Sequence, residues 1–248
     1  MSFPYGQGRE NARTETIKIS FYDETVNEHR PKNSFRTTMQ KFGELAGGTV
    51  IHCEIFIPKC KGTICVDEEC GGPLCEDARH AREPYEFPGG WVRALKTQGV
   101  TVQNRRYMDT NVYVLSRKVT PAVHEKMARY AYAQIGKPFN DWDMYRAGLP
   151  TNFMGLDLRK RFCANTTGQS WFCSQLTAKL LTFDGLYTGI ELGTVRPQDI
   201  SDDIIRHIEH CRTHTNPKTG LPLKPEWECT GHDQKIIDAK MARKHSRR

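Results

Sequence analysis

A cysteine at position 173 stands where a helix is expected to begin. It lies in the stretch WFCSQLTAKLL (171–181), in which a helix-forming run follows the cysteine at once. The unpaired N–H groups and the dipole at a helix start lower the pKa of a thiol and can hold an oxyanion during acyl transfer. Cys173 is therefore a candidate nucleophile, although a cysteine in a first helical turn is more often a packing residue.

A nucleophilic cysteine needs a general base, which is most often a histidine. His52 differs in context from the other eight histidines because it leads a strand pattern in GGTVIHCEIFIP (47–58), on the face opposite the Ile/Cys row. A third group must orient the imidazole. The next predicted strand, GTICVDEE (62–69), is expected to pair with the first and ends in Asp67, Glu68 and Glu69. The alternative interpretation is a half-exposed strand histidine and a solvated acidic hairpin end.

Two cysteine-containing clusters could be metal sites. Cys60, Cys65, Cys70 and Cys75 recur every five residues, whereas zinc ligand pairs are usually two to four residues apart, so we interpret this spacing as coincidence or packing. A second cluster offers two cysteines and two histidines: His210, Cys211, Cys229 and His232. A polar helix end followed by a loose tail is the favoured interpretation there. No phosphate-binding loop and no dinucleotide-binding glycine pattern occurs.

The apolar patterns predict an α+β domain in which an antiparallel sheet packs on helices. Apolar residues make up 38% of the 248 residues, which is enough for a real core. The helix at 120–140 has the clearest signals, with Thr120 as N-cap, Pro121 in the first turn and Gly136 as stop. The predicted strands are 17–23, 47–58, 62–69, 100–107 and 111–119, and the predicted helices are 89–99, 120–140, 172–182 and 196–210.

The two ends of the chain are polar and lack an apolar pattern of their own. We expect an N-terminal arm (1–44), a main domain (45–210) and a polar, basic C-terminal tail (211–248). Proteases should remove the arm and the tail from the isolated protein and leave the domain. The net charge is +7, and the stretch 235–248 carries six Lys/Arg against one Asp. A solvated terminus explains this charge best, and contact with nucleic acid, an acidic partner or an anionic membrane comes second.

The composition also bears on location. No apolar run approaches membrane-spanning length, and the polar start MSFPYGQGRENARTE has no secretory h-region. Nine cysteines, an odd number, then favour reduced thiols in a cytoplasmic or virion setting over a disulfide framework.

Four stretches occur in an order that resembles a known family. They are HCEIFI (52–57), the helix ending in GKPFN (136–140), FCSQLTAKLL (172–181) and TVRPQDI (194–200). In this order the sequence resembles the circularly permuted, NlpC-type branch of papain-like cysteine hydrolases, which includes YiiX-like, lecithin–retinol-acyltransferase-like and poxvirus proteins. The resemblance covers roughly residues 47–205. Phe139 and Asn140 depart from the Tyr-Asp that usually ends the family's second element.

The resemblance implies a permuted papain-like fold and a site made of Cys173 as nucleophile, His52 as base and a third, acidic member. Counting back from Gly71 and Gly72 favours Asp67 for the third role, with Glu68 close behind. The expected activity is that of a thiol-dependent hydrolase or acyltransferase on an amide, ester or thioester, which needs no metal or organic cofactor. Its substrate would be a peptide, a lipid or another acyl compound.

A second hypothesis keeps the fold without the chemistry. Some relatives of this kind act only as structural or binding proteins, so the chain could be a catalytically inactive scaffold, for example a virion component. The polar arm and the basic tail would suit binding to neighbouring protein subunits. The reactivity of Cys173 separates the two hypotheses, because a thiolate paired with histidine alkylates fast near neutral pH.

Overall fold

The computed structural model describes residues 14–23, 49–67, 72–77, 79–104, 112–147, 168–229 and 231–245. Its strands are β1 (Glu15–Asp23), β2 (Val50–Ile57), β3 (Cys60–Cys65), β4 (Arg82–Phe87), β5 (Gly90–Leu95), β6 (Gly99–Gln103), β7 (Val112–Val119) and β8 (Trp227–Glu228). Its helices are α2 (Pro121–Gln134), α3 (Asp141–Ala147), α5 (Cys173–Leu181), α6 (Pro197–Thr213) and α7 (Gly231–His245), with 3₁₀ turns at Thr182–Asp184 and Leu192–Thr194.

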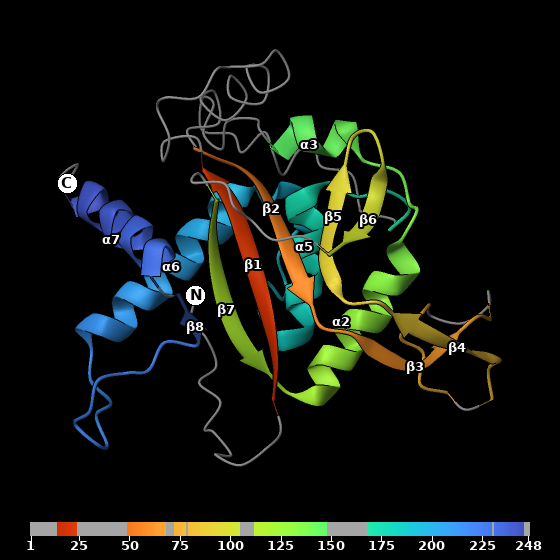
Figure 1. Cartoon of the computed structure of the whole chain (residues 1–248), viewed down its shortest axis with the longest axis horizontal. Helices are drawn as coiled ribbons and strands as arrows, with labels where there is room; N and C mark the ends of the chain where they lie inside the picture. Colours follow the sequence, from red (N-terminus) through yellow and green to blue (C-terminus); the bar gives the residue numbers. More distant parts are fainter. Residues whose placement is uncertain are drawn as a thin grey trace.

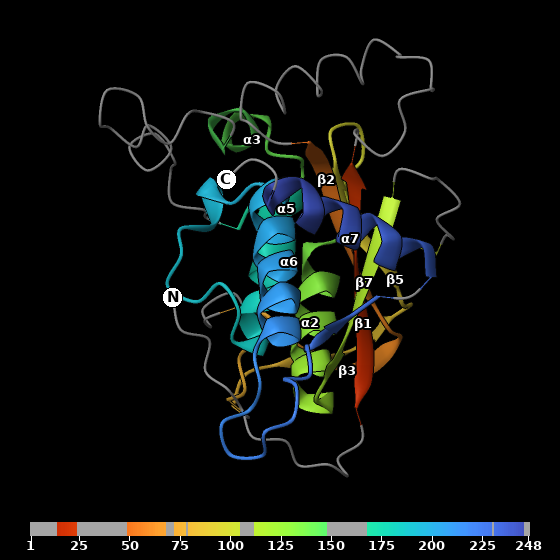
Figure 2. The ribbon, with the colours of Figure 1, turned by 90° about the vertical axis from the view of Figure 1, so that its left-hand side faces the viewer.

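The centre of the molecule is a six-stranded antiparallel sheet with helices packed on it. The strand order is β6-β5-β2-β1-β7-β8. Helices α2, α5 and α6 lie along one face of this sheet (Figures 1 and 2). The α+β class and the antiparallel sheet packed on helices are therefore confirmed.

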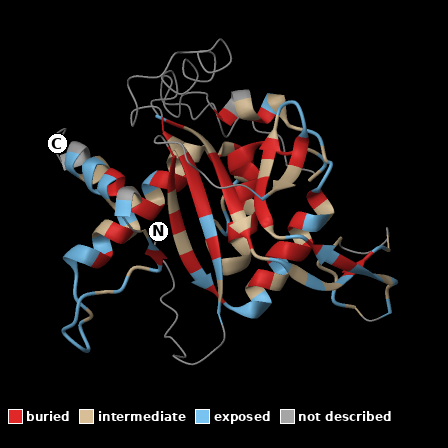
Figure 3. Cartoon of the chain, viewed as in Figure 1, coloured by how far each residue is buried: buried red, intermediate tan, exposed pale blue. Residues whose placement is uncertain are grey.

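The hydrophobic core lies between the sheet and these helices (Figure 3). On β2 the side chains of Cys53, Ile55 and Ile57 are fully buried, as the alternating pattern predicts. The alternation breaks at the start of the strand, because His52 pairs with Tyr22 whereas Val50 pairs with Asp23. Ile51, which lies between His52 and Val50, is therefore an extra residue on β2. This β-bulge places Val50, instead of Ile51, in the buried row.

The helices at 120–140, 172–182 and 196–210 are confirmed as α2, α5 and α6. The Thr120 side chain caps α2 by accepting the N–H of Val123 at 3.3 Å, and Pro121 opens the helix. The predicted helix at 89–99 is wrong. That segment forms β5 and the turn into β6, because pairing with β2 and β6 on both sides buries Trp91, Val92 and Ala94.

The predicted hairpin between the strands at 47–58 and 62–69 is also wrong. The chain leaves the main sheet at Pro58, and β3 pairs with β4 in a separate two-stranded sheet. The neighbours of β2 are instead β1 and β5. This second sheet projects from the main one beside α2 (Figure 1).

Both ends of the chain contribute to the main sheet. Strand β1, inside the expected arm, lies between β2 and β7, with Ile17, Ile19 and Phe21 fully buried. Inside the expected tail, β8 pairs with β7, and α7 buries Ile237 in the core. Within the described residues, no helix combines the length and the apolar character needed to cross a membrane.

Candidate active site

Cys173 is the first residue of α5, as the sequence predicts, and only 6% of it is exposed. Phe172 is the N-cap, and its backbone N–H donates to the side chain of Gln175 at 3.3 Å. The hydroxyl of Ser174 donates to the carbonyl of Val195 at 2.7 Å. The start of the helix is thus held on both sides of the cysteine.

The residue two positions before the cysteine anchors the entry to α5. Trp171 is buried, and its indole N–H donates to Gln134 at the end of α2 over 2.9 Å. Its backbone N–H donates to the carbonyl of Pro138, and its carbonyl accepts the N–H of Asn140. Asn140 caps α3 by accepting the N–H of Asp143 at 3.0 Å. The GKPFN stretch therefore fixes the chain that leads into Cys173.

His52 lies near the start of β2, directly after the β-bulge. Its ring lies 5.4 Å from the ring of Tyr22, its partner on β1. A bulge bends a strand and increases its twist. Two successive β2 residues, His52 and Cys53, both act on the thiol of Cys173.

The thiol of Cys173 and the imidazole of His52 shift each other's pKa in opposite directions. Burial lowers the pKa of His52, but the charge and hydrogen bond of Cys173, together with Glu54, raise it to about 9. A hydrogen bond with Cys53 is the largest influence that holds the pKa of Cys173 well below its usual range; burial opposes it, and the charge of His52 reinforces it. The favoured state at neutral pH is a thiolate beside an imidazolium.

Glu54 is the carboxylate that contacts the histidine. Its Oε1 lies 2.9 Å from Nε2 of His52, and its side chain is fully buried. The same oxygen lies 2.8 Å from Nε of Arg93. Arg93 lies on β5 next to Val92, which pairs with Ile55, the residue after Glu54 on β2. Arg93 in turn donates to Gln103 at 2.7 Å. This chain of contacts engages Nε2 of His52.

Cys53 is a second thiol at the site. It is fully buried on the helix-facing side of β2, and its Sγ lies 3.7 Å from the hydroxyl of Thr177 on α5. Burial and the neighbouring Cys173 raise the pKa of Cys53, so this thiol keeps its proton. The S–H of Cys53 donates to the hydroxyl of Thr177, and the proximity of Cys53 lowers the pKa of Cys173.

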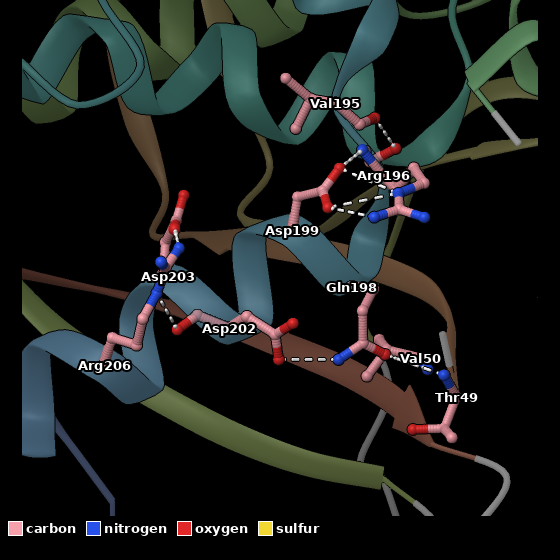
Figure 4. A network of polar contacts seen from close by, with 10 residues as sticks. Thr49, Val50, Val195, Arg196, Gln198, Asp199, Asp202, Asp203 and Arg206 are labelled. Carbon is pink, nitrogen blue, oxygen red and sulfur yellow. Dashed lines mark hydrogen bonds and ion pairs between the residues drawn. The ribbon is translucent and has the colours of Figure 1, made fainter. Parts of the chain in front are cut away.

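The first turn of α6 and the residues just before it connect β2 to α5 by hydrogen bonds; Figure 4 shows the contacts with β2. The side-chain oxygen of Gln198 accepts the backbone N–H groups of Thr49 and Val50 at 2.8 and 2.9 Å, immediately before the bulge. The amide of Gln198 donates to Asp202 at 2.7 Å, which fixes its orientation. Val195, three residues earlier, accepts from Ser174 beside the nucleophile.

Of the four residues predicted for the site, the structure brings Cys173 and His52 together and places Asp67 elsewhere. Asp67 follows β3, on the separate sheet, and its charge acts on His80 instead. Glu68 lies outside the described residues. The carboxylate at the imidazole is Glu54, which the sequence analysis missed although the period of two places it on the same face of β2 as His52.

The cluster at 207–232 does not form a metal site in the described structure. Cys211 is fully buried and lies 3.7 Å from Nε2 of His207, while Cys229 donates to Gln234 at 3.0 Å. The ring centroids of His210 and His214 lie 4.0 Å apart, with the ring planes tilted by 30°. The side chain of His232 lies outside the described residues.

Together these contacts make a site suited to nucleophilic attack. The thiolate of Cys173 lies at a helix start, where the first backbone N–H groups have no partner within the helix and can stabilise a developing oxyanion. His52 carries a proton that it can give to a leaving group, and Glu54 holds its ring. No protein-family model, no curated protein and no solved structure matches the chain.

Proposed function

We propose that the protein is a thiol-dependent hydrolase or acyltransferase that acts on an amide, ester or thioester. The observation that carries this proposal is the pairing of Cys173, at the start of α5, with His52, whose ring Glu54 holds from the other side. A buried cysteine with only a packing role would need neither a histidine nor a carboxylate in this arrangement.

The reaction follows from the charges of the pair. The Cys173 thiolate attacks the carbonyl carbon, and N–H groups at the start of α5 stabilise the oxyanion. His52 then gives its proton to the leaving amine, alcohol or thiol as the carbonyl re-forms. Neutral His52 takes a proton from an incoming water or other nucleophile, which attacks the thioester and releases the acyl group from Cys173. Water makes the protein a hydrolase, and an amine or alcohol acceptor makes it an acyltransferase.

The same elements support a permuted papain-like arrangement as the fold. The base strand precedes the nucleophile helix in the chain, as in the family that the sequence resembles. The two other stretches of the resemblance contact this centre: GKPFN bonds to Trp171, and PQDI supplies Gln198, which holds the start of β2. Each stretch thus has a place next to the site.

Acylation by p-nitrophenyl acetate tests the proposal. The wild-type protein should release nitrophenolate in a burst of about one equivalent and carry an acetyl group on Cys173, as identified by peptide mass spectrometry. Cys173→Ala should abolish the burst and keep the fold, because it removes only a sulfur atom from the helix start. Cys229→Ala, in which a thiol outside the site is lost, should behave as wild type.

His52→Ala separates catalysis from simple thiol reactivity. It should slow both acetylation of Cys173 and release of the acetyl group, since the imidazole takes part in both steps. Acetylation of Cys173 that proceeds equally fast in this variant would overturn the proposal. The protein would then be better explained as a structural scaffold, for instance in a virion, that retains the fold.

A further inference from the structure

A second cluster of ligand-type side chains lies on the separate sheet of β3 and β4. Cys65 ends β3, Cys75 lies in the following loop, and His80 comes just before β4. One ligand atom from each lies within 4.8 Å of the other two. Within the described residues, this is the one group of three or more such side chains that meets this distance.

The geometry points to a Zn²⁺ site with Cys65, Cys75 and His80 as its three protein ligands, and we propose this site as a structural clip. Zinc binds thiolates at about 2.3 Å and imidazole at about 2.0 Å in tetrahedral geometry, so ligand atoms around one ion lie about 3.5–3.8 Å apart. Sγ of Cys75 lies 3.0 Å from Nδ1 of His80, so these two need only a small separation to admit the ion. Two soft sulfurs and an imidazole favour zinc over Mg²⁺ or Ca²⁺.

The loop that carries the ligands is held by its own hydrogen bonds. The N–H of Cys75 donates to the carbonyl of Gly72 at 3.0 Å, and Arg82 donates to the carbonyl of Cys75 at 2.7 Å. The N–H of Val66 donates to the carbonyl of Ala81 at 3.1 Å, which extends the pairing of β3 and β4 past Cys65 to the residue next to His80. The ligands therefore come from segments that the backbone already brings together.

A metal ion at this place would stabilise the small sheet of β3 and β4. A two-stranded sheet is marginal on its own in water. The buried apolar side chains of β3 and β4 are few: Ile64, Cys65, Tyr85 and Phe87. A metal ion that joins the end of β3, the loop and the start of β4 would close the long connection between the strands and stabilise it. This role is independent of the chemistry proposed for Cys173.

Zinc content and cobalt spectra test the site. The full chain, purified with reductant and without chelator, should hold about one zinc per chain. Replacement by Co²⁺ should give the intense visible bands of a tetrahedral ion and a thiolate-to-cobalt charge-transfer band. Cys75→Ser and His80→Gln should each weaken zinc affinity by more than the ~10–100-fold that loss of an outer-sphere partner costs. Cys229→Ser and Cys173→Ser, which remove thiols elsewhere, should keep wild-type affinity.

Alkylation of the wild-type protein gives a readout that does not depend on the folding of a variant. Saturating zinc should protect Cys65 and Cys75 from iodoacetamide while Cys229 is labelled at an unchanged rate, and chelation should remove the protection. Two results would each overturn the proposal. One is labelling of Cys65 and Cys75 that zinc does not change, and the other is unaltered zinc affinity in both Cys75→Ser and His80→Gln.

Discussion

The two partners of Cys173 predict how fast this thiol is alkylated at different pH values. Only the thiolate reacts, so the rate follows the ionised fraction. A thiol with an ordinary pKa of about 8.5 is about one quarter ionised at pH 8 and about 0.03% ionised at pH 5, so its rate falls about 10³-fold between them. Because Cys53 and His52 hold the pKa of Cys173 well below that range, its rate should fall far less.

Removing the partners should restore the steep fall. Cys53→Ala deletes the hydrogen bond that lowers the pKa most, and His52→Ala deletes the positive charge. The double variant leaves burial as the main remaining influence, and burial raises the pKa of Cys173, so the fall should reach about 10³-fold, which is the limit for a change of three pH units. The two single effects should not add, because both residues contact one sulfur atom.

The assay is iodoacetamide labelling of the four proteins between pH 5 and pH 9, read peptide by peptide because the chain has nine cysteines. Cys229 serves as an internal reference, since burial raises its pKa and no mutated residue contacts it. It should show the same steep profile in all four proteins. If Cys173 has that same profile in the wild type and in the double variant, the charge pair does not exist.

Four further outcomes are expected. Turnover should decline as the pH rises through about 9, where His52 loses the proton that it donates, because its pKa is raised from 6.5 in the folded protein. Glu54→Gln should lower that limit and the turnover, whereas Asp67→Asn should change neither; pH–rate profiles compare the two. Gln198→Ala leaves two backbone N–H groups without their acceptor and should cost about 1–3 kcal/mol of stability in urea unfolding. Ile237→Ala should cost about 2–5 kcal/mol in the same assay if α7 belongs to the core.

The places of Cys173 at a helix start and of His52 on a strand could be predicted from the sequence because each depends on local structure. The helix-forming residues after Cys173 indicate a helix start, and the alternation of apolar and polar residues around His52 indicates a strand. The bulge at Ile51 has no such signal, since it arises from pairing with β1, a strand far away in the chain. The predicted alternation therefore failed at the start of β2, where the register shifts.

The predicted acidic partner of His52, Asp67, follows the wrong strand because the strands at 47–58 and 62–69 do not form the expected hairpin. Short connections usually join paired strands, but the chain crosses at Pro58 into a separate sheet and takes Asp67 with it. Glu54 was within reach of sequence reasoning, whereas Arg93 was not, because its segment resembles a helix until β2 and β6 pair with it. Pairing between distant segments overrides local preference in such strands.

The central place of β1 has a consequence for the synthesis of the protein. This strand leaves the ribosome early, but Ile17 pairs with Arg117, and the nucleophile Cys173 follows later still. Contacts between segments so far apart form slowly and only after the intervening chain has been made. A nascent chain that ends before α5 carries His52 and Glu54 without Cys173, so the site proposed for catalysis can form only once translation has passed α5.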